Sequence, residues 1–174
     1  KDLYKILTAT LRIKVPIFVA RQMRTSQVGF SYSDLYVEGE AFAFNEVSRR
    51  YVNSEPEFYK IQEWRVREGK SIKQGSTGVA GDSDIIHYLN TEQETIQAIS
   101  NGVYSASIAE KIAPEQTRAL LPQSMYTEFY MTGTLQRWKQ FITLRLQKDV
   151  QQETREITQL IASRLEEVYS DWLE

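Results

Sequence analysis

The stretch TATLRIKVPIFVARQMR (8–24) decides the fold class. In its first half Leu11, Ile13 and Val15 alternate with polar residues, which predicts a strand with one buried face. Pro16 ends this strand, because proline cannot donate a hydrogen bond to a β-ladder, and proline suits the first position of a helix. The stretch therefore predicts a strand that leads directly into a helix with polar residues at its end.

Helices dominate the second half of the chain. The TEQE sequence (91–94) has the spacing of a capping box and predicts the start of a helix, with a break near Gly102. Pro114 suits the first position of a short helix, and Asp149 with Gln152 is expected to cap the last one. Strands early and helices late predict an α+β fold, and no boundary divides residues 1–174, so a single domain is expected.

Apolar residues recur at helical spacing along these predicted helices. They form a stripe in the first long helix, are expected to be buried in the segment after Gly133, and line the core face of the last helix. The three sets are Ile96, Ile99, Val103, Ile108 and Ile112; Leu135, Trp138, Phe141, Ile142 and Leu144; and Ile157, Leu160, Ile161, Leu165, Val168 and Trp172.

The composition excludes several classes of active site. The 174 residues contain no cysteine and one histidine, His87, which is expected to be structural or exposed. Disulfides, cysteine-based metal sites and thiol nucleophiles are therefore excluded, and no metal site is expected. Either this is a binding protein, or something other than its side chains carries the chemistry.

Charge and hydropathy limit the partners. With 21 basic and 23 acidic residues the formal charge is -2, so the chain is not a polybasic nucleic-acid binder. No apolar run approaches the roughly 20 residues that span a bilayer, and the N-terminus lacks the pattern of a signal peptide. We expect no nucleic-acid or membrane partner and a location in the cytoplasm, or in the host cytoplasm if the chain is virus-encoded.

Three segments of the first half have no regular pattern. Residues 31–44 are aromatic and acidic, and positions 37–40 within them form either a hairpin turn or part of a loop. NEVSRRY (45–51) is either a polar wall that binds phosphate oxygens or the start of a helix with Asn45 as its N-cap. Residues 70–84 are rich in glycine and are expected to form a loop.

Arginines are the side chains best suited to bind phosphate or carbonyl groups, because a guanidinium offers a planar fork of donors. Arg118 precedes a Leu-Leu-Pro sequence, and Arg145 lies inside an apolar helix. The Arg145 guanidinium either reaches solvent at the helix edge or is held inward by an anionic partner.

Several motifs, in the same order along the chain, resemble the flavin-dependent thymidylate synthases, especially virus- and phage-borne members. They are VPIFVARQ (15–22), NEVSRRY (45–51), EPEFY (55–59), KQGS (73–76), EQTRALLPQSMYTEFYMTGT (115–134) and FITLRLQKDVQQE (141–153). The resemblance implies a central antiparallel sheet flanked by helices, and a homotetramer with active sites formed across subunits. It also implies transfer of a methylene group from methylenetetrahydrofolate to C5 of dUMP and its reduction by FAD, which NADPH recharges.

The resemblance also assigns residues to the substrate. Arg145 matches the arginine credited with activating the uracil, which suits a guanidinium because it stays protonated and can stabilise negative charge on the ring. The positions expected to bind dUMP are Gln22, Arg24, Glu46, Val47, Ser48, Arg49, Arg50, Arg118 and Arg145.

The flavin contacts depart from the family pattern. Thr25, Ser26 and Gln27 stand where the family has Arg-His-Arg, and Arg24 is expected to replace part of that charge. Residues 31–43 form an insertion, whose aromatic residues and their neighbour Phe44 either stack on flavin or pack. The positions expected to bind FAD are Thr25, Ser26, Gln27, Glu46, Thr134, Leu135, Gln136 and Gln140, and the aromatic residues in question are Tyr32, Tyr36, Phe42 and Phe44.

Three functions follow from this pattern. The first is reductive methylation of dUMP at C5 to dTMP. The second is a related flavoenzyme that modifies another pyrimidine nucleotide, by hydroxymethylation or by methylation of UMP. The third is a non-catalytic homologue that binds a pyrimidine nucleotide, since most departures fall on the flavin contacts and the dUMP set is nearly complete.

Overall fold

The computed structural model describes residues 5–25, 42–48, 55–67, 75–76 and 78–170, and it confirms the α+β class. Its centre is an antiparallel sheet in the order β1-β5-β2, formed by β1 (Thr8–Pro16), β5 (Tyr126–Thr134) and β2 (Ala43–Glu46). Ile13 on β1 and Glu46 on β2 both lie opposite Phe129 of the central strand. Strands from the two halves of the chain therefore share one sheet.

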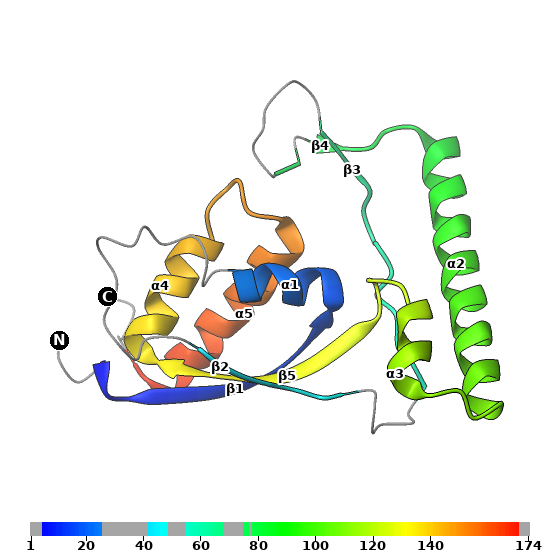
Figure 1. The fold of residues 1–174 in the computed structure, drawn as a ribbon. Helices are drawn as coiled ribbons and strands as arrows, with labels where there is room; N and C mark the ends of the chain where they lie inside the picture. Colours follow the sequence, from blue (N-terminus) through cyan, green and yellow to red (C-terminus); the bar gives the residue numbers. More distant parts are fainter. Residues whose placement is uncertain (1–4, 26–41, 49–54, 68–74, 77, 171–174) are drawn as a thin grey trace.

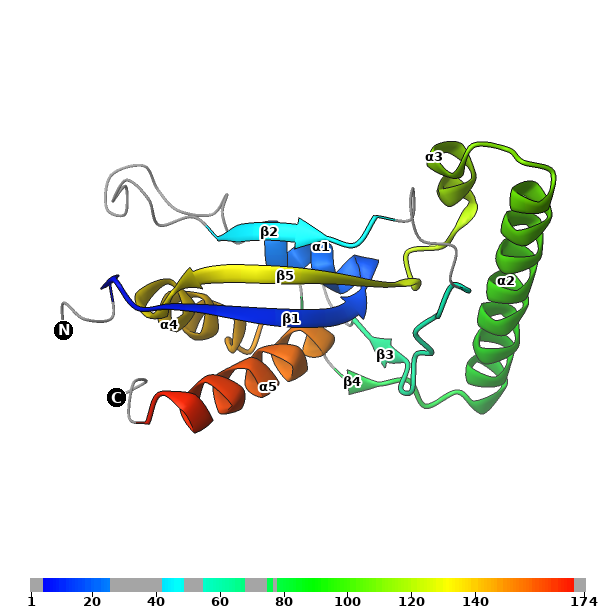
Figure 2. The ribbon, with the colours of Figure 1, turned by 90° about the horizontal axis from the view of Figure 1, so that it is seen from below.

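Three helices cover one face of this sheet (Figures 1 and 2). They are α1 (Ile17–Thr25), α4 (Leu135–Arg145) and α5 (Gln152–Val168). The alternation predicted for the first strand is confirmed, since Ile13 and Val15 are buried while Arg12 and Lys14 are exposed. The predicted helix also follows Pro16 directly, and its first residue, Ile17, donates its N–H to the carbonyl of Met125 at 2.9 Å.

The hydrophobic core lies between the sheet and these helices. Its fully buried side chains include Val15, Val19, Met23, Phe129, Met131, Leu135, Trp138 and Leu165. Phe42, just before β2, packs its ring against Trp138 and Phe141, with ring centroids 4.6 and 5.7 Å apart. Phe44 contacts Phe129, so both phenylalanines pack within the fold. Tyr32, Tyr36 and the turn expected at 37–40 lie outside the described residues.

A second group of elements lies beside the sheet (Figure 1). It consists of β3 (Arg65–Val66), β4 (Gly78–Val79), α2 (Ser83–Ala109), α3 (Pro114–Thr117) and the short 3-10 helix η2 (Arg118–Leu120). Pro114 occupies the start of α3 as predicted. Gln97 of α2 is buried and donates to the carbonyl of Tyr59 at 2.9 Å, which ties the extended chain before β3 to this helix.

The predicted start of the long helix is wrong. Helix α2 begins at Ser83, and the side chain of Asp82 accepts hydrogen bonds from two amides of the first turn, at 3.0 and 3.1 Å. Thr91 lies inside the helix, where its hydroxyl donates to a carbonyl one turn earlier. Gly102 does not break the helix either. The segment 70–84 therefore contains β4 and the first residues of α2 in its described part, and is not a loop throughout.

Part of the prediction for the last two helices is also wrong. The N-cap of α5 is Gln151, whose side chain makes no capping bond, and Asp149 lies in the turn before it. Apolar residues expected in the core but found exposed are Leu144 on α4 and Leu160 and Val168 on α5. The buried faces of α4 and α5 are narrower than the predicted stripes, because only their sheet-facing sides pack against the core. Trp172 lies outside the described residues.

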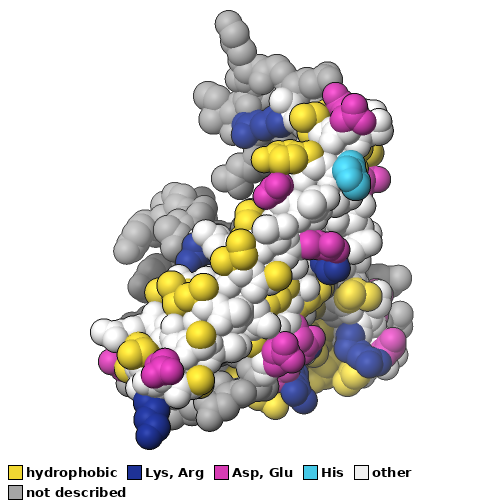
Figure 3. All heavy atoms as spheres, turned by 90° about the vertical axis from the view of Figure 1, so that its right-hand side faces the viewer, with side chains coloured by type: hydrophobic (Ala, Val, Ile, Leu, Met, Phe, Trp, Pro, Cys, Tyr) yellow, Lys and Arg dark blue, Asp and Glu magenta, His cyan; other side chains and the backbone are white. Residues whose placement is uncertain are grey.

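The apolar stripe of α2 is present but points outward. Ile96, Ile99 and Val103 are all about half exposed, as is Ile112 beyond the end of the helix, whereas only Gln97 and Tyr104 of α2 are buried. Figure 3, which faces this side of the molecule, shows apolar side chains on the surface. Among the described helices, none combines the length and the apolarity needed to cross a bilayer.

Candidate functional site

An open cleft of about 440 Å³ lies where β1, β2, β5 and η2 end or begin. Its lining residues are Lys14, Ile17, Glu46, Val47, Ser48, Glu55, Glu57, Arg118, Met125, Tyr126, Thr127 and Glu128. The cleft therefore brings together three residues of the NEVSRRY motif with Arg118, although these lie far apart in the sequence.

The pairing of β2 with β5 positions the NEVSRRY motif at the cleft. Asn45 and Glu46 belong to β2, and the N–H of Val47 continues the pairing by donating to the carbonyl of Glu128 at 2.9 Å. The interpretation of this motif as a helix start with Asn45 as its N-cap is therefore wrong. Arg49 and Arg50 lie outside the described residues.

Three carboxylates of the cleft have cationic partners. Glu57 accepts from Lys14 at 2.7 Å, Glu128 from Arg12 at 2.6 Å, and Glu46 from Arg24 at 2.7 Å. The hydrogen bond from Arg12 lowers the pKa of Glu128 below its ordinary value.

Arg118 lies at the start of η2, exposed, with no carboxylate partner among the described residues. Three of the four carboxylates that line the cleft pair with other cations, and the fourth, Glu55, accepts from the Asn101 amide at 3.3 Å and makes no described ion pair with Arg118. The Arg118 guanidinium therefore stays available to an anion entering the cleft.

Glu46 connects the cleft to the end of α1. Its second carboxylate oxygen accepts a hydrogen bond from the hydroxyl of Thr127 at 2.5 Å. The Arg24 guanidinium that binds Glu46 also lies 5.5 Å from the ring centroids of both Phe44 and Phe129. The Arg24 guanidinium, which was expected to bind flavin or phosphate, therefore pairs with a carboxylate of this chain and lies near two of its aromatic rings.

Gln22, on α1, is hydrogen-bonded to the last residue of α4 and to the start of α5. Its backbone carbonyl accepts from Nη2 of Arg145 at 2.6 Å and from the hydroxyl of Thr25 at 3.0 Å. Its side-chain amide donates to Oε1 of Gln151 at 2.6 Å, and its side-chain oxygen accepts from the hydroxyl of Thr154 at 3.3 Å. Three residues expected at the site, Gln22, Thr25 and Arg145, therefore meet at one carbonyl oxygen.

The surroundings of Arg145 match neither of the two alternatives stated above. Its described partner is a neutral carbonyl, and no carboxylate lies within ion-pair distance among the described residues. Burial lowers the pKa of Arg145 below its ordinary value, although an arginine stays charged in a protein. Its Nε–H is buried without an acceptor, so this guanidinium keeps unused donor capacity.

The start of α4 holds the residues expected at the flavin. The hydroxyl of Thr134 caps the helix by accepting from the N–H of Arg137 at 3.1 Å. Leu135 is fully buried, and its own N–H donates to the carbonyl of Leu7 at 2.9 Å. Gln140 accepts from the Arg137 side chain at 3.2 Å, and Gln136 is half-buried.

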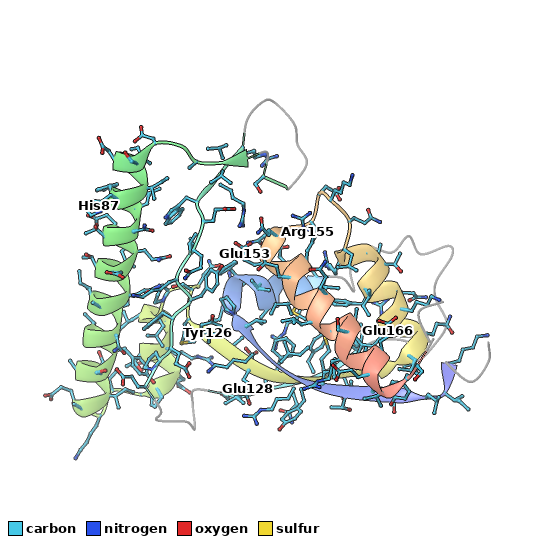
Figure 4. All side chains as sticks on the ribbon, turned by 180° about the vertical axis from the view of Figure 1, so that it is seen from behind. His87, Tyr126, Glu128, Glu153, Arg155 and Glu166 are labelled. Atoms are coloured by element: carbon cyan, nitrogen blue, oxygen red, sulfur yellow. The ribbon has the colours of Figure 1, made fainter. Side chains whose placement is uncertain are left out.

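A second hollow, of about 340 Å³, lies between the start of α5 and the strands β3 and β4. Gly75 and Ser76 of the KQGS motif line it, together with Arg65 and Glu153, which form a largely buried ion pair at 2.5 Å. Figure 4 shows Glu153 at the start of α5. Burial acts to raise the pKa of Glu153, but the hydrogen bond and charge of Arg65, together with hydrogen bonds from its own backbone amide and from Gln151, outweigh it, so that the pKa is lowered.

The sequence pattern missed several of these contacts. Arg137 is buried and lies 5.3 Å from the ring centroid of Phe42, although a charged side chain on a helix is usually solvated. The Arg65 and Glu153 pair joins positions that no local pattern relates. The QQE sequence (151–153) at the end of the last motif was the one sequence feature that pointed to the start of α5 as part of the site.

Comparison with known proteins shows the family of this chain. Residues 3–169 match the sequence family described as Thy1, thymidylate synthase complementing protein. The chain belongs to this family. Two of its relatives are flavin-dependent thymidylate synthases: that of Thermus thermophilus, 31% identical over 94% of this chain, and the probable one of Paramecium bursaria Chlorella virus 1, 30% identical over 78%. At a similar identity, the match to the bacterial relative covers more of this chain than the match to the viral one.

The Thy1 relatives are longer than this chain, which spans 54% of the Thermus thermophilus protein and 60% of the viral one. A solved structure, of a UMP/dUMP methylase PolB from Streptomyces cacaoi bound with 5-Br UMP, superposes with a TM-score of 0.75. That match covers 92% of this chain and 68% of the other at 21% identity, so it shows the shared fold.

The positions at the start of α4 that were expected to bind flavin are engaged within this chain. At the start of α4 the Leu135 side chain lies in the core, and the Thr134 hydroxyl and the Leu135 N–H have partners inside the chain. These positions do not form an open flavin surface within one chain. Ser26 and Gln27 lie outside the described residues.

His87 has no part in this site. It is exposed on α2, and Figure 4 shows it on the helix away from the sheet. In the described ranges no group of three or more His, Cys, Asp or Glu side chains is arranged to hold a metal ion.

Proposed function

We propose that this protein catalyses the reductive methylation of dUMP at C5 to dTMP, with methylenetetrahydrofolate, FAD and NADPH. The observation that carries this proposal is the cleft that gathers Glu46, Val47 and Ser48 with Arg118. Its volume of about 440 Å³ lies within the range of small-molecule sites. Family membership supports the same reaction, since the named relatives are flavin-dependent thymidylate synthases.

The charges of the cleft suit a nucleotide monophosphate. Three of its carboxylates are paired with Lys14, Arg12 and Arg24, so the remaining guanidinium of Arg118 is proposed to bind the phosphate. Ser48 and the backbone amides of its segment add neutral donors, and Arg49 and Arg50, which lie outside the described residues, are proposed to contribute charge.

Arg145 is proposed to bind the uracil. Nη2 of Arg145 donates to the Gln22 carbonyl, its buried Nε–H has no acceptor among the described residues, and Arg145 is not one of the residues that line the cleft. Its remaining N–H groups are proposed to donate to a ring carbonyl. A fixed cation at this point stabilises negative charge that develops on the ring, and it does so without exchanging a proton. FAD supplies the hydride when it is bound, and Thr25, Glu46, Gln136 and Gln140 are proposed to contact it.

Self-association as a homotetramer, with active sites formed across subunits, is part of the same proposal. The exposed apolar stripe of α2 supports it, because contiguous apolar surface of this kind marks interaction sites. The side chains concerned are Ile85, Tyr88, Ile96, Ile99 and Val103, which recur at helical spacing along one face.

A second candidate function is nucleotide binding without flavin or catalysis. It is favoured by the pairing of Arg24 with Glu46 and by the burial of Leu135, because both positions are engaged within the chain.

Two measurements separate the candidates. Release of tritium from C5-labelled dUMP, with FAD, NADPH and the folate present, is expected to exceed a flavin-free control. The visible spectrum of the purified protein is expected to contain a flavin band. A colourless protein that gains thermal stability with dUMP and not with FAD supports the second candidate instead. Mass spectrometry of the products from dUMP, UMP and dCMP identifies the nucleotide.

A further inference from the structure

We infer that Gln151 is a positioning residue for Arg145 and acts through Gln22; the inference rests on the proposed function. Gln22 is held from two sides by neighbouring parts of the chain. The end of α4 reaches its backbone carbonyl through Arg145, and the start of α5 reaches its side chain through Gln151 and Thr154.

The bond from Gln22 to Gln151 is the short contact of this arrangement. Nε2 of Gln22 lies 2.6 Å from Oε1 of Gln151, and the Thr154 hydroxyl holds the other end of the same amide at 3.3 Å. Thr154 is fully buried, and its carbonyl accepts from the buried hydroxyl of Thr158 at 2.7 Å, so it is fixed within α5. Both ends of the Gln22 amide are therefore anchored to one rigid helix.

This anchor matters for Arg145 because the guanidinium has few other restraints. The Gln22 carbonyl is its one acceptor among the described residues, and its Nε–H has none. A long side chain with a single hydrogen bond samples several rotamers unless its acceptor is fixed. Movement of the Gln22 carbonyl would therefore displace the Arg145 guanidinium, whose donors are proposed to bind the uracil.

The position of Gln151 is the second, independent sign of this role. It is the N-cap of α5, a position at which Ser, Thr, Asn and Asp satisfy the free amides of the first turn. The Gln151 side chain makes no capping bond; it accepts from Gln22 and also hydrogen-bonds the Glu153 carboxylate, whose pKa it helps to lower. A residue that forgoes local stability for a distant contact is expected at functional positions.

The substitution Gln151→Ser separates the position of residue 151 as the N-cap of α5 from its contact with Gln22. Serine caps a helix well, so the variant is expected to keep its thermal midpoint or to gain roughly 2–4 °C. The same change removes the bond to Gln22, and the dissociation constant for dUMP is expected to rise about five- to tenfold. The matched control is Gln152→Ser, because Gln152 is the next residue and bonds only Glu156 among the described side chains.

Two readouts test the inference. Calorimetric titration with dUMP measures affinity, and NMR of the arginine side-chain nitrogens measures how firmly Arg145 is held; the Arg145 signal is assigned by its absence in Arg145→Lys. The inference predicts weaker binding and a shifted, averaged Arg145 signal in Gln151→Ser and in Thr154→Val, and neither in Gln152→Ser. An unchanged Arg145 signal in Gln151→Ser overturns it. If the unmodified protein does not bind dUMP, the proposed function fails, and the NMR comparison alone decides the inference.

Discussion

Replacement of Gly133 by alanine tests how the core supports the cleft. A Cβ atom on Gly133 would lie 2.5 and 2.6 Å from two ring carbons of Phe42, far inside van der Waals contact. The Phe42 ring cannot retreat easily, because it is buried and packed edge-on against Trp138 and Phe141 at centroid distances of 4.6 and 5.7 Å. Overpacking of this kind costs about 1–3 kcal/mol. For a chain of this size the thermal midpoint is expected to fall by roughly 2–12 °C.

Thermal and urea unfolding measure the effect, and two comparisons isolate its cause. Gly102→Ala is the matched control, since nothing lies within 4 Å of a Cβ built there and the residue is inside a helix. This control is expected to gain about 0.5–1 kcal/mol. Phe42→Ala alone is expected to lose about 3–5 kcal/mol, and adding Gly133→Ala to it should cost nothing further, because the colliding ring is gone.

The reasoning is refuted if Gly133→Ala is as stable as the unmodified protein, or if the two substitutions are additive. A functional consequence is also expected. Phe42 lies just before β2, whose last residue, Glu46, borders the cleft, so displacement of the ring should weaken dUMP binding along with stability.

Four further predictions concern the cleft, the fold and the surface. Arg118→Gln should weaken dUMP binding about tenfold or more, because a charge-assisted hydrogen bond to the phosphate is lost. The unfolding midpoint should not change, because no described ion pair is broken. Equal dUMP affinity of the two proteins in titration would contradict the assignment of Arg118 to the phosphate. Arg65→Met should cost about 3–5 kcal/mol at pH 7 and much less near pH 3. The reason is that the lowered pKa of Glu153 stabilises the fold above the ordinary pKa of a glutamate, and this stabilisation disappears as the pH falls through the lower folded-state pKa; equal losses in urea unfolding at both pH values would contradict it. Thr134→Ala should lose about 1 kcal/mol in the same assay, because the cap of α4 is removed, whereas Thr134→Ser should retain it. Ile99→Glu should reduce the mass measured by light scattering without unfolding the chain, and an unchanged mass would argue against the α2 stripe as an association surface.

The errors in the sequence-based prediction have identifiable physical causes. The capping-box pattern at Thr91 is real as a pattern, but the side chain of Asp82 already satisfies the first amides of α2, so the helix begins earlier. Gly102 weakens a helix by about 1 kcal/mol, which is too little to break a helix of 27 residues. Asp149 was expected to cap α5, yet the turn that follows Arg145 ends at Gln151, whose side chain is drawn toward Gln22.

An apolar stripe predicted burial correctly only where a neighbouring element covers it. The stripe on α4 correctly identified Trp138 and Phe141 as core, because that helix packs on the sheet. The similar stripe on α2 is exposed, because periodicity shows that a helix has an apolar face and not what covers that face. For the same reason the prediction that Leu160 of α5 faces the core was wrong, since this residue is exposed.

Local interactions could be predicted from the sequence. The strand at 8–16 and the helix after Pro16 follow from alternation and from the chemistry of proline. The family motifs indicated residues that are proposed to bind the nucleotide, and the structure gathers four of them in one cleft: Glu46, Val47, Ser48 and Arg118. The tertiary structure alone decided that Arg24 pairs with Glu46 and that Gln22 binds both Arg145 and Gln151. These contacts depend on the strand order β1-β5-β2 and on how α1 meets the ends of α4 and α5, and no pattern within one segment carries that geometry.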